Sequence, residues 1–138
     1  MRGHRVMKRV LFVCVENSCR SQMAEAFAKI HGKDRLEAHS AGSRASGKVN
    51  EKAIKSMREV GYDLNTQRSK SLNEIPAAEY EYAITMGCGD ECPYVKAKRR
   101  QDWAIPDPKA MNEQDFNQVR DTIETKVLSL IDSMNRDG

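Results

Sequence analysis

The segment that decides the fold is Val10-Leu11-Phe12-Val13-Cys14-Val15-Glu16-Asn17-Ser18-Cys19-Arg20-Ser21. Four successive apolar residues are typical of a buried strand in a parallel sheet, and we expect this strand to end at Cys14. A helix is expected to begin near Arg20, so the residues between them form a loop at a helix N-terminus. Backbone N–H groups and the helix dipole make such a loop a binding site for an anion.

Two side chains of this loop carry the predicted chemistry. Thiols at helix N-termini ionise more readily than free cysteine, so Cys14 is predicted to be a thiolate nucleophile. The planar guanidinium of Arg20 can bind two oxygens of one oxyanion. Ser21 is placed to hydrogen-bond the Cys14 sulfur, and Asn17 to brace the loop through hydrogen bonds between its side chain and the backbone. The predicted oxyanion-binding loop consists of Val15, Glu16, Asn17, Ser18, Cys19, Arg20 and Ser21.

Three amphipathic helices are predicted from apolar residues that recur every three or four positions. Asn50 and Asn112 are expected to cap the second and third helices, and Gly32 and Gly61 to end the first and second. Their inward faces are expected to consist of Met23, Ala26, Phe27 and Ile30; of Ala53, Ile54, Met57 and Val60; and of Phe116, Val119, Ile123, Val127, Leu130 and Met134.

Short strands are expected at residues 9–14, 36–39 and 80–86, with an edge strand at 103–105. Their alternation with the helices predicts one α/β domain over residues 1–138, a three-layer α/β/α domain with a small, mainly parallel four-stranded sheet. Residues 1–7 are predicted to be a flexible N-terminal extension. Sites in such sheets lie beyond the carboxyl ends of the strands. The loop after Cys14 and the segment after the third strand are therefore expected to share one rim.

Composition and charge restrict the class of function. The 138 residues are 39% hydrophobic and 31% charged, which is ordinary for one globular domain. A net charge of +3 suits an anionic substrate but does not indicate nucleic-acid binding. The basic run 96–100 is predicted to be a solvated loop. No apolar run approaches the roughly 20 residues that span a bilayer, and no signal peptide is visible, so a cytoplasmic location without membrane contact is expected.

A second group of reactive residues is the pair Cys88 and Cys92. Four cysteines without a secretion signal favour redox, catalytic or metal-binding roles over structural disulfides. Two thiols within five residues can close a small disulfide and exchange with Cys14. The alternatives are a tetrahedral zinc site shared with Cys14 and Cys19, which the neighbouring Arg20 disfavours, or no chemical role. We expect redox exchange and no bound metal.

A third candidate is Asp107, which lies between Pro106 and Pro108. The flanking prolines restrict the backbone and present the carboxylate in a defined direction. Near a bound oxyanion, such a carboxyl group can protonate the departing oxygen; the alternative is that Asp107 only makes a turn. No histidine has an evident catalytic partner, so the loop itself must activate Cys14.

Taken together, these residues resemble an arsenate reductase of the type built on the low-molecular-weight tyrosine phosphatase fold. The matching segments are 13–25, 40–42, 85–86 with the cysteines and proline that follow, 107–108 and 119–121, within a resemblance that covers about residues 8–134.

The resemblance implies a role for each residue. Cys14 would attack arsenate, Arg20 would bind the anion, and Asp107 would assist loss of an oxygen. Cys88 and then Cys92 would carry the resulting disulfide to a reducing protein, commonly thioredoxin. Cys19, an extra loop cysteine that the family often has, need not belong to this relay. We expect a monomer without a tightly bound cofactor, in which arsenate, phosphate or sulfate can occupy the loop.

Two features depart from the pattern of thioredoxin-coupled members. Only three residues separate Cys88 from Cys92, so either the relay runs on a shorter loop or the donor is a glutaredoxin with a small thiol. The loop also carries Glu16 where many relatives have glycine. We expect Glu16 to face solvent or to pair with a base such as Arg44 or Lys48.

Two other functions remain open at this point. A low-molecular-weight phosphatase acting on phosphotyrosine or a small phosphate ester needs only Cys14, Arg20 and Asp107. Such phosphatases usually place aromatic residues directly after the Asp-Pro pair, where this chain has Lys109 and Ala110. A thiol-based redox or metal sensor would instead use the four cysteines without turnover.

Overall fold

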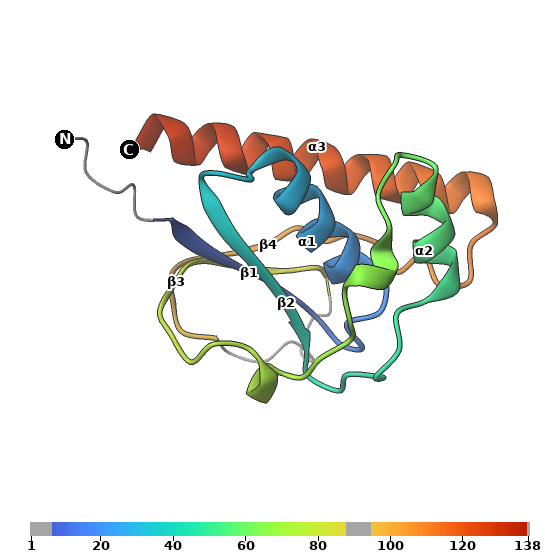
Figure 1. The fold of residues 1–138 in the computed structure, drawn as a ribbon, viewed down its shortest axis with the longest axis horizontal. Helices are drawn as coiled ribbons and strands as arrows, with labels where there is room; N and C mark the ends of the chain where they lie inside the picture. The colour runs from blue at the N-terminus through green and yellow to red at the C-terminus, as the bar shows by residue number, and fades with distance from the viewer. Residues whose placement is uncertain (1–6, 88–94, 138) are drawn as a thin grey trace.

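The first three strands alternate with helices along the chain in the computed structural model, which describes residues 7–87 and 95–137 (Figure 1). Two short 3₁₀ helices, η1 (Leu64–Thr66) and η2 (Leu72–Glu74), lie between the second α-helix and the third strand. The strands are β1 (Lys8–Cys14), β2 (Leu36–Gly42), β3 (Tyr80–Thr85) and β4 (Ala97–Asp102), and the α-helices are α1 (Arg20–His31), α2 (Glu51–Arg58) and α3 (Glu113–Asp137).

The four strands form one parallel sheet in the order β2-β1-β3-β4. The central strand β1 pairs with β2 on one side and β3 on the other, and β4 continues the sheet beyond β3. In this register Cys14 lies beside Gly42, and Val13 lies beside both Ala41 and Thr85. The carboxyl ends of these strands therefore meet at one edge of the sheet. The predicted α/β class with a parallel four-stranded sheet is confirmed.

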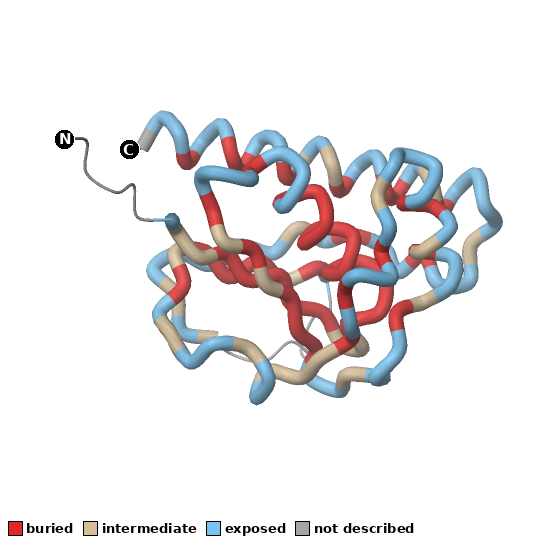
Figure 2. Tube along the Cα trace, in the orientation of Figure 1, coloured by how far each residue is buried: buried red, intermediate tan, exposed pale blue. Residues whose placement is uncertain are grey.

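The core lies on both faces of β1, because successive side chains of a strand point to opposite faces. Val10 and Phe12 join the larger buried cluster, which contains residues of α1, α2 and α3. Leu11 and Val13 join a smaller cluster on the other face, covered in part by the segment that carries η2. Figure 2 shows the result, in which β1 and most of α1 are buried. This burial fixes the strand end that bears Cys14.

The predicted edge strand at 103–105 is wrong, because the fourth strand comprises Ala97–Asp102. It therefore contains most of the basic run 96–100, which was predicted to be a loop. The strand carries no apolar pattern because its side chains are largely exposed, and its parallel pairing with β3 holds it in the sheet. Residues 103–105 follow this strand: the Trp103 N–H still donates to the Thr85 carbonyl over 2.9 Å, and Ala104 has a positive φ of 50°.

The predicted helices are confirmed, with two errors in their inward faces. Ile30, in the last turn of α1, is 40% exposed. Val60 is also exposed, since α2 ends at Arg58 and helical spacing no longer applies to it. Both predicted caps are present: the Asn50 side chain accepts from the Lys52 N–H, and the Asn112 side chain accepts from the Asp115 N–H.

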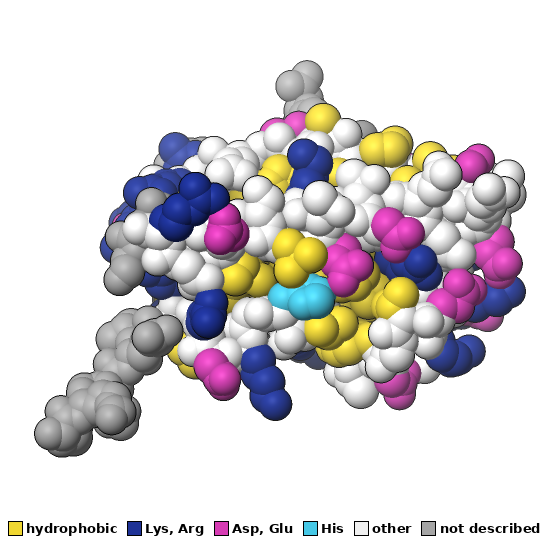
Figure 3. Space-filling view, turned by 90° about the horizontal axis from the view of Figure 1, so that it is seen from above, with side chains coloured by type: hydrophobic (Ala, Val, Ile, Leu, Met, Phe, Trp, Pro, Cys, Tyr) yellow, Lys and Arg dark blue, Asp and Glu magenta, His cyan; other side chains and the backbone are white. Residues whose placement is uncertain are grey.

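The outer surface of the helical layer is shown in Figure 3. Acidic and basic side chains are mixed over this face, with hydrophobic side chains between them. Within the two described ranges, no helix combines the length and the apolar character needed to cross a bilayer. The long helix α3 instead contributes Phe116 and Ile123 to the core.

Candidate active site

The loop between β1 and α1 has its carbonyl groups bonded outward. Those of Cys14, Val15 and Glu16 accept from the N–H groups of residues 43, 44 and 46, and that of Ser18 from residue 50. Since N–H points away from C=O in a trans peptide, this pattern turns the loop amides toward the interior. Gly42 permits the close approach, because a Cβ there would lie 2.4 Å from the Val15 carbonyl oxygen.

Two hydrogen bonds converge on the Cys14 sulfur. The Asn17 N–H donates to Sγ over 3.2 Å, and the Ser21 Oγ lies 2.7 Å from Sγ. Because the Asn17 Nδ2 donates to the Ser21 Oγ over 2.8 Å, the Ser21 hydroxyl is free to donate its own hydrogen to sulfur. The contact predicted between Ser21 and the Cys14 sulfur is therefore observed.

Asn17 is the point at which the loop is tied to a distant part of the chain. It is fully buried and adopts a positive φ of 52°, a left-handed conformation that asparagine tolerates. Its Oδ1 accepts from the Gln22 Nε2 and from the Lys70 N–H, each over 2.8 Å. Gln67 in turn donates to the Gln22 side chain. The sequence interpretation missed Gln22, Gln67 and Lys70 because no local motif marks them.

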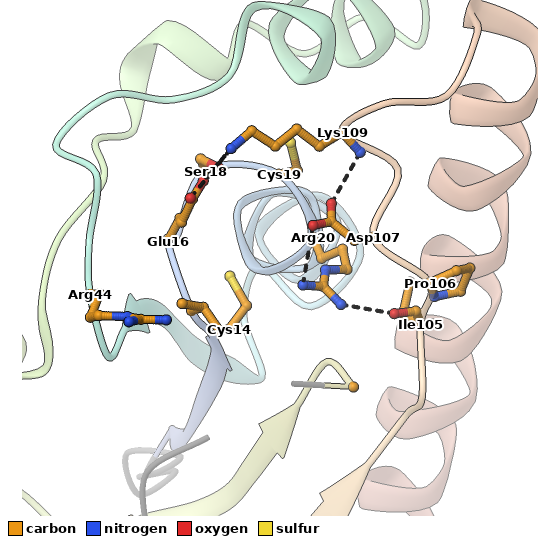
Figure 4. A pocket seen from close by; sticks show the side chains of 12 residues that line it. Cys14, Glu16, Ser18, Cys19, Arg20, Arg44, Ile105, Pro106, Asp107 and Lys109 are labelled. Carbon is orange, nitrogen blue, oxygen red and sulfur yellow. Dashed lines mark hydrogen bonds and ion pairs between the residues drawn. The ribbon is translucent and has the colours of Figure 1, made fainter. Parts of the chain in front are cut away.

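Arg20 reaches from the first turn of α1 to the segments that follow β3 and β4. Its Nη1 donates to the carbonyls of Met86 and Ile105, over 2.8 and 2.9 Å. Its Nη2 lies 4.0 Å from the Asp107 Oδ2 (Figure 4). Two carbonyls thus fix the guanidinium plane, and the side chain remains only 11% exposed. The structure brings Cys14, Arg20 and Asp107 together, as the sequence analysis predicted.

Asp107 combines the two alternatives considered for it. Its Oδ1 accepts from the Lys109 N–H over 3.0 Å, which makes a local turn. Its Oδ2 faces Arg20, and the side chain is 56% exposed. The same carboxylate can therefore hold the turn with one oxygen and present the other to the pocket.

These residues enclose a cavity of about 400 Å³. Figure 4 shows the Cys14 sulfur facing this space, with the Arg44 guanidinium directed toward it from the opposite side. Arg44 was considered only as a partner for Glu16, and its place in the pocket wall was not foreseen. None of the described residues that line the cavity is aromatic. They are Cys14, Val15, Glu16, Ser18, Cys19, Arg20, Arg44, Gly87, Ile105, Pro106, Asp107 and Lys109.

Glu16 pairs with Lys109, a base that the sequence analysis did not name. Its Oε1 and Oε2 lie 3.0 and 3.3 Å from the Lys109 Nζ, whereas Lys48 pairs with Glu51. The expected contact with a base is therefore present, but the base is Lys109, because the loop after Asp107 approaches the anion loop only in the tertiary structure. The expected exposure is observed, since the Glu16 side chain is 43% exposed.

Cys88 and Cys92 lie outside the described residues. The described chain reaches Gly87, which lines the cavity and has a φ of 91°. Its N–H donates to the Asp102 Oδ1 over 2.9 Å. The segment after β3 therefore begins at the pocket that contains Cys14. Within residues 7–87 and 95–137, no three His, Cys, Asp or Glu side chains cluster as a metal site would require.

Cys19 also lines the cavity, but its chemistry differs from that of a nucleophile. Burial raises the pKa of the Cys19 thiol to about 12, against a smaller opposing effect of its hydrogen bond to Ser18. The thiol is therefore protonated at neutral pH. Since the thiolate is the reactive form, Cys19 is unsuited to attack an electrophile.

We expect iodoacetamide at neutral pH to alkylate Cys14 in the folded protein and to leave Cys19 unmodified, as read by peptide mass spectrometry. The reason is the raised pKa of Cys19, which holds its thiol in the unreactive form. Labelling in guanidinium chloride is the control, since unfolding removes the burial and should expose both thiols equally. Comparable labelling of Cys14 and Cys19 before unfolding would contradict this assignment.

Comparisons with known proteins identify the family of this chain. The sequence model of the low molecular weight phosphotyrosine protein phosphatase family matches residues 9–138. A glutaredoxin arsenate reductase from Synechocystis sp. is 39% identical over 128 residues, which are 91% of this chain and 97% of that relative. A solved arsenate reductase in the phosphate binding state has a TM-score of 0.83 at 38% identity, covering 92% of this chain and 98% of the other.

A thioredoxin-dependent arsenate reductase of Corynebacterium glutamicum has a TM-score of 0.76 at 27% identity, covering 96% of this chain and 64% of that one. Residues 9–138, which the family model matches, include the anion loop, β2, β3, β4 and α3. The chain belongs to the low molecular weight phosphotyrosine protein phosphatase family, among the arsenate reductases that share its fold.

Proposed function

We propose that the protein reduces arsenate to arsenite, as a cytoplasmic monomer that takes its electrons from a thiol-containing reducing protein. One observation carries this proposal: the Cys14 sulfur, with two hydrogen bonds directed at it, faces a cavity that Arg20 and Asp107 also border. Such a cavity suits a tetrahedral oxyanion. The similarity to arsenate reductases supports arsenate as that anion.

In the proposed first step, the Cys14 thiolate attacks arsenic. A sulfur–arsenic bond forms and one arsenic–oxygen bond breaks. Arg20 and the loop amides bind the remaining oxygens, because the planar guanidinium forms bidentate hydrogen bonds with oxyanions. Asp107 donates the proton with which the departing oxygen leaves as water. The arsenic is still pentavalent after this step.

The reduction itself requires a second thiol. Cys88 attacks the Cys14 sulfur, a disulfide forms, and the electron pair of the sulfur–arsenic bond stays on arsenic, which leaves as trivalent arsenite. Cys92 then attacks Cys88 and releases Cys14, so that the disulfide passes to Cys88 and Cys92. A reducing protein restores the two thiols. This relay is inferred from the family resemblance and from the start of the segment at Gly87.

The donor is proposed to be thioredoxin or a glutaredoxin. The relatives include a glutaredoxin arsenate reductase and a thioredoxin-dependent one, and they do not separate the two donors for this chain. Only three residues separate Cys88 from Cys92. Identifying the donor would therefore show whether so short a loop can pass its disulfide to thioredoxin.

We expect arsenate-dependent oxidation of NADPH when the protein is mixed with thioredoxin and thioredoxin reductase, or with glutaredoxin, glutathione and its reductase. We expect only slow hydrolysis of p-nitrophenyl phosphate, because the described cavity wall offers a phenyl ring no aromatic partner. Activity with the glutaredoxin system but not with thioredoxin would still identify a reductase, with glutaredoxin as its electron donor. No arsenate-dependent NADPH oxidation with either donor, together with rapid ester hydrolysis, would show that the protein is a phosphatase and not a reductase.

A further inference from the structure

An ion pair joins the two loops that form the pocket. The Lys109 Nζ lies 3.0 Å from the Glu16 Oε1, and the side chain of Lys109 crosses from the loop of Asp107 to the anion loop (Figure 4). The two partners are separated by 93 positions in the chain. Both line the cavity, and each is about half exposed. The pair is therefore a direct link between the Cys14 loop and the Asp107 loop.

The backbone of Lys109 is held as well. Its N–H donates to the Asp107 Oδ1, and its carbonyl accepts from the Lys52 Nζ over 2.9 Å. Lys52 also donates to the Met111 carbonyl over 3.0 Å. Since Lys52 lies in the first turn of α2, these bonds attach the Asp107 loop to that helix. The ion pair of Lys109 with Glu16 attaches the Asp107 loop to the anion loop as well.

The charge of Glu16 needs explanation in an anion site. It stands two residues after Cys14, where an unpaired carboxylate would repel both a thiolate and an oxyanion. Its contact with Lys109 offsets this repulsion, and it raises the pKa of Lys109, so the lysine stays charged. The carboxylate of Glu16, which alone would oppose anion binding, therefore links the two loops through its ion pair with Lys109.

We propose that Glu16 and Lys109 are positioning residues for Asp107: their ion pair holds the turn in which the Asp107 carboxyl faces the departing oxygen. The inference rests on the proposed function, because it requires Asp107 to act as the acid in arsenate reduction. Proton transfer depends on the geometry of the donor, so a loosened turn slows the first step even when the anion is bound.

The test is a mutant cycle on single-turnover rates, read as arsenate-dependent loss of two thiols without reductant. Glu16→Gln and Lys109→Gln should each slow the first step about two- to fivefold, the effect expected of an exposed ion pair. Asp107→Asn should slow it by roughly 10²–10⁴-fold. Neither Gln substitution should slow the Asp107→Asn protein further. The exchanged pair, Glu16→Lys with Lys109→Glu, should recover most of the wild-type rate.

Phosphate affinity separates positioning from a simple charge effect. Removing the negative charge of Glu16 should tighten phosphate binding, and removing the positive charge of Lys109 should weaken it, as measured by calorimetry. Positioning predicts that both variants nevertheless lose rate. If the rates follow phosphate affinity instead, or if the loss persists in the Asp107→Asn background, the proposal is wrong.

A matched control is Lys55→Gln, which breaks another exposed ion pair between elements, that of Lys55 with Glu113. It should change neither the rate nor phosphate binding. A readout independent of activity is hydrogen exchange of the segment 105–111, which should quicken in both Gln variants and not in the control. Unchanged exchange would overturn the inference. A wild-type protein that fails to reduce arsenate would contradict the proposed function alone, and the exchange data would still decide whether the pair holds this turn.

Discussion

Cys14→Ser should abolish both arsenate reduction and any hydrolysis of phosphate esters, a loss of more than about 10⁴-fold. Serine preserves the shape of the side chain but replaces an ionisable thiol with a hydroxyl that stays protonated. Neither the Ser21 hydroxyl nor the Asn17 N–H can compensate, because both act as partners of the sulfur and not as bases. The measurements are NADPH oxidation in the coupled assay and release of p-nitrophenol.

Phosphate binding is the control for Cys14→Ser. The anion contacts come from the loop amides and Arg20, whose guanidinium is fixed by the carbonyls of Met86 and Ile105 and does not depend on the sulfur. We therefore expect the variant to bind phosphate and to unfold at nearly the wild-type temperature. Arsenate reduction by this variant would show that another thiol attacks arsenic. Cys19 is a poor candidate, since burial holds its pKa at about 12.

Cys88→Ser should abolish multiple-turnover reduction and leave ester hydrolysis unchanged. Without the second thiol, the adduct of Cys14 with arsenate cannot release trivalent arsenic, whereas hydrolysis of an ester needs only Cys14, Arg20 and Asp107. The contrast with Cys14→Ser is the informative part, because that substitution removes both reactions. The same two assays measure it, and thiol counting after arsenate should show no loss of two thiols. Normal turnover by Cys88→Ser with thioredoxin would disprove the relay.

The elements predicted correctly from the sequence are those with a local pattern of apolar residues that become buried in the fold. β1 is continuously apolar because both of its faces are covered. The long helix α3 repeats buried residues at helical spacing over its whole length. β4 gave no such signal, since its side chains are exposed and only its hydrogen bonds to β3 make it a strand. A polar edge strand is defined by its partner and not by its own pattern.

The anion loop shows how far local sequence determines a site. Cys14, Asn17, Arg20 and Ser21 lie within eight consecutive residues. A strand followed at once by a helix leaves little freedom in how such a loop closes, so spacing alone predicted the bond between Ser21 and sulfur. Asp107 was recognisable for a similar reason, since the prolines on either side restrict its backbone.

The sequence by itself determined the α/β class, the nucleophile loop and the identity of the candidate acid, because each depends on neighbours along the chain. Only the tertiary structure decided that Lys70 and Gln22 hold Asn17, that Arg44 faces the pocket and that Lys109 pairs with Glu16. The last of these contacts joins residues 93 positions apart. Such contacts between distant residues depend on the order of the strands and on where each loop leaves the sheet. No local pattern of side chains encodes either of these.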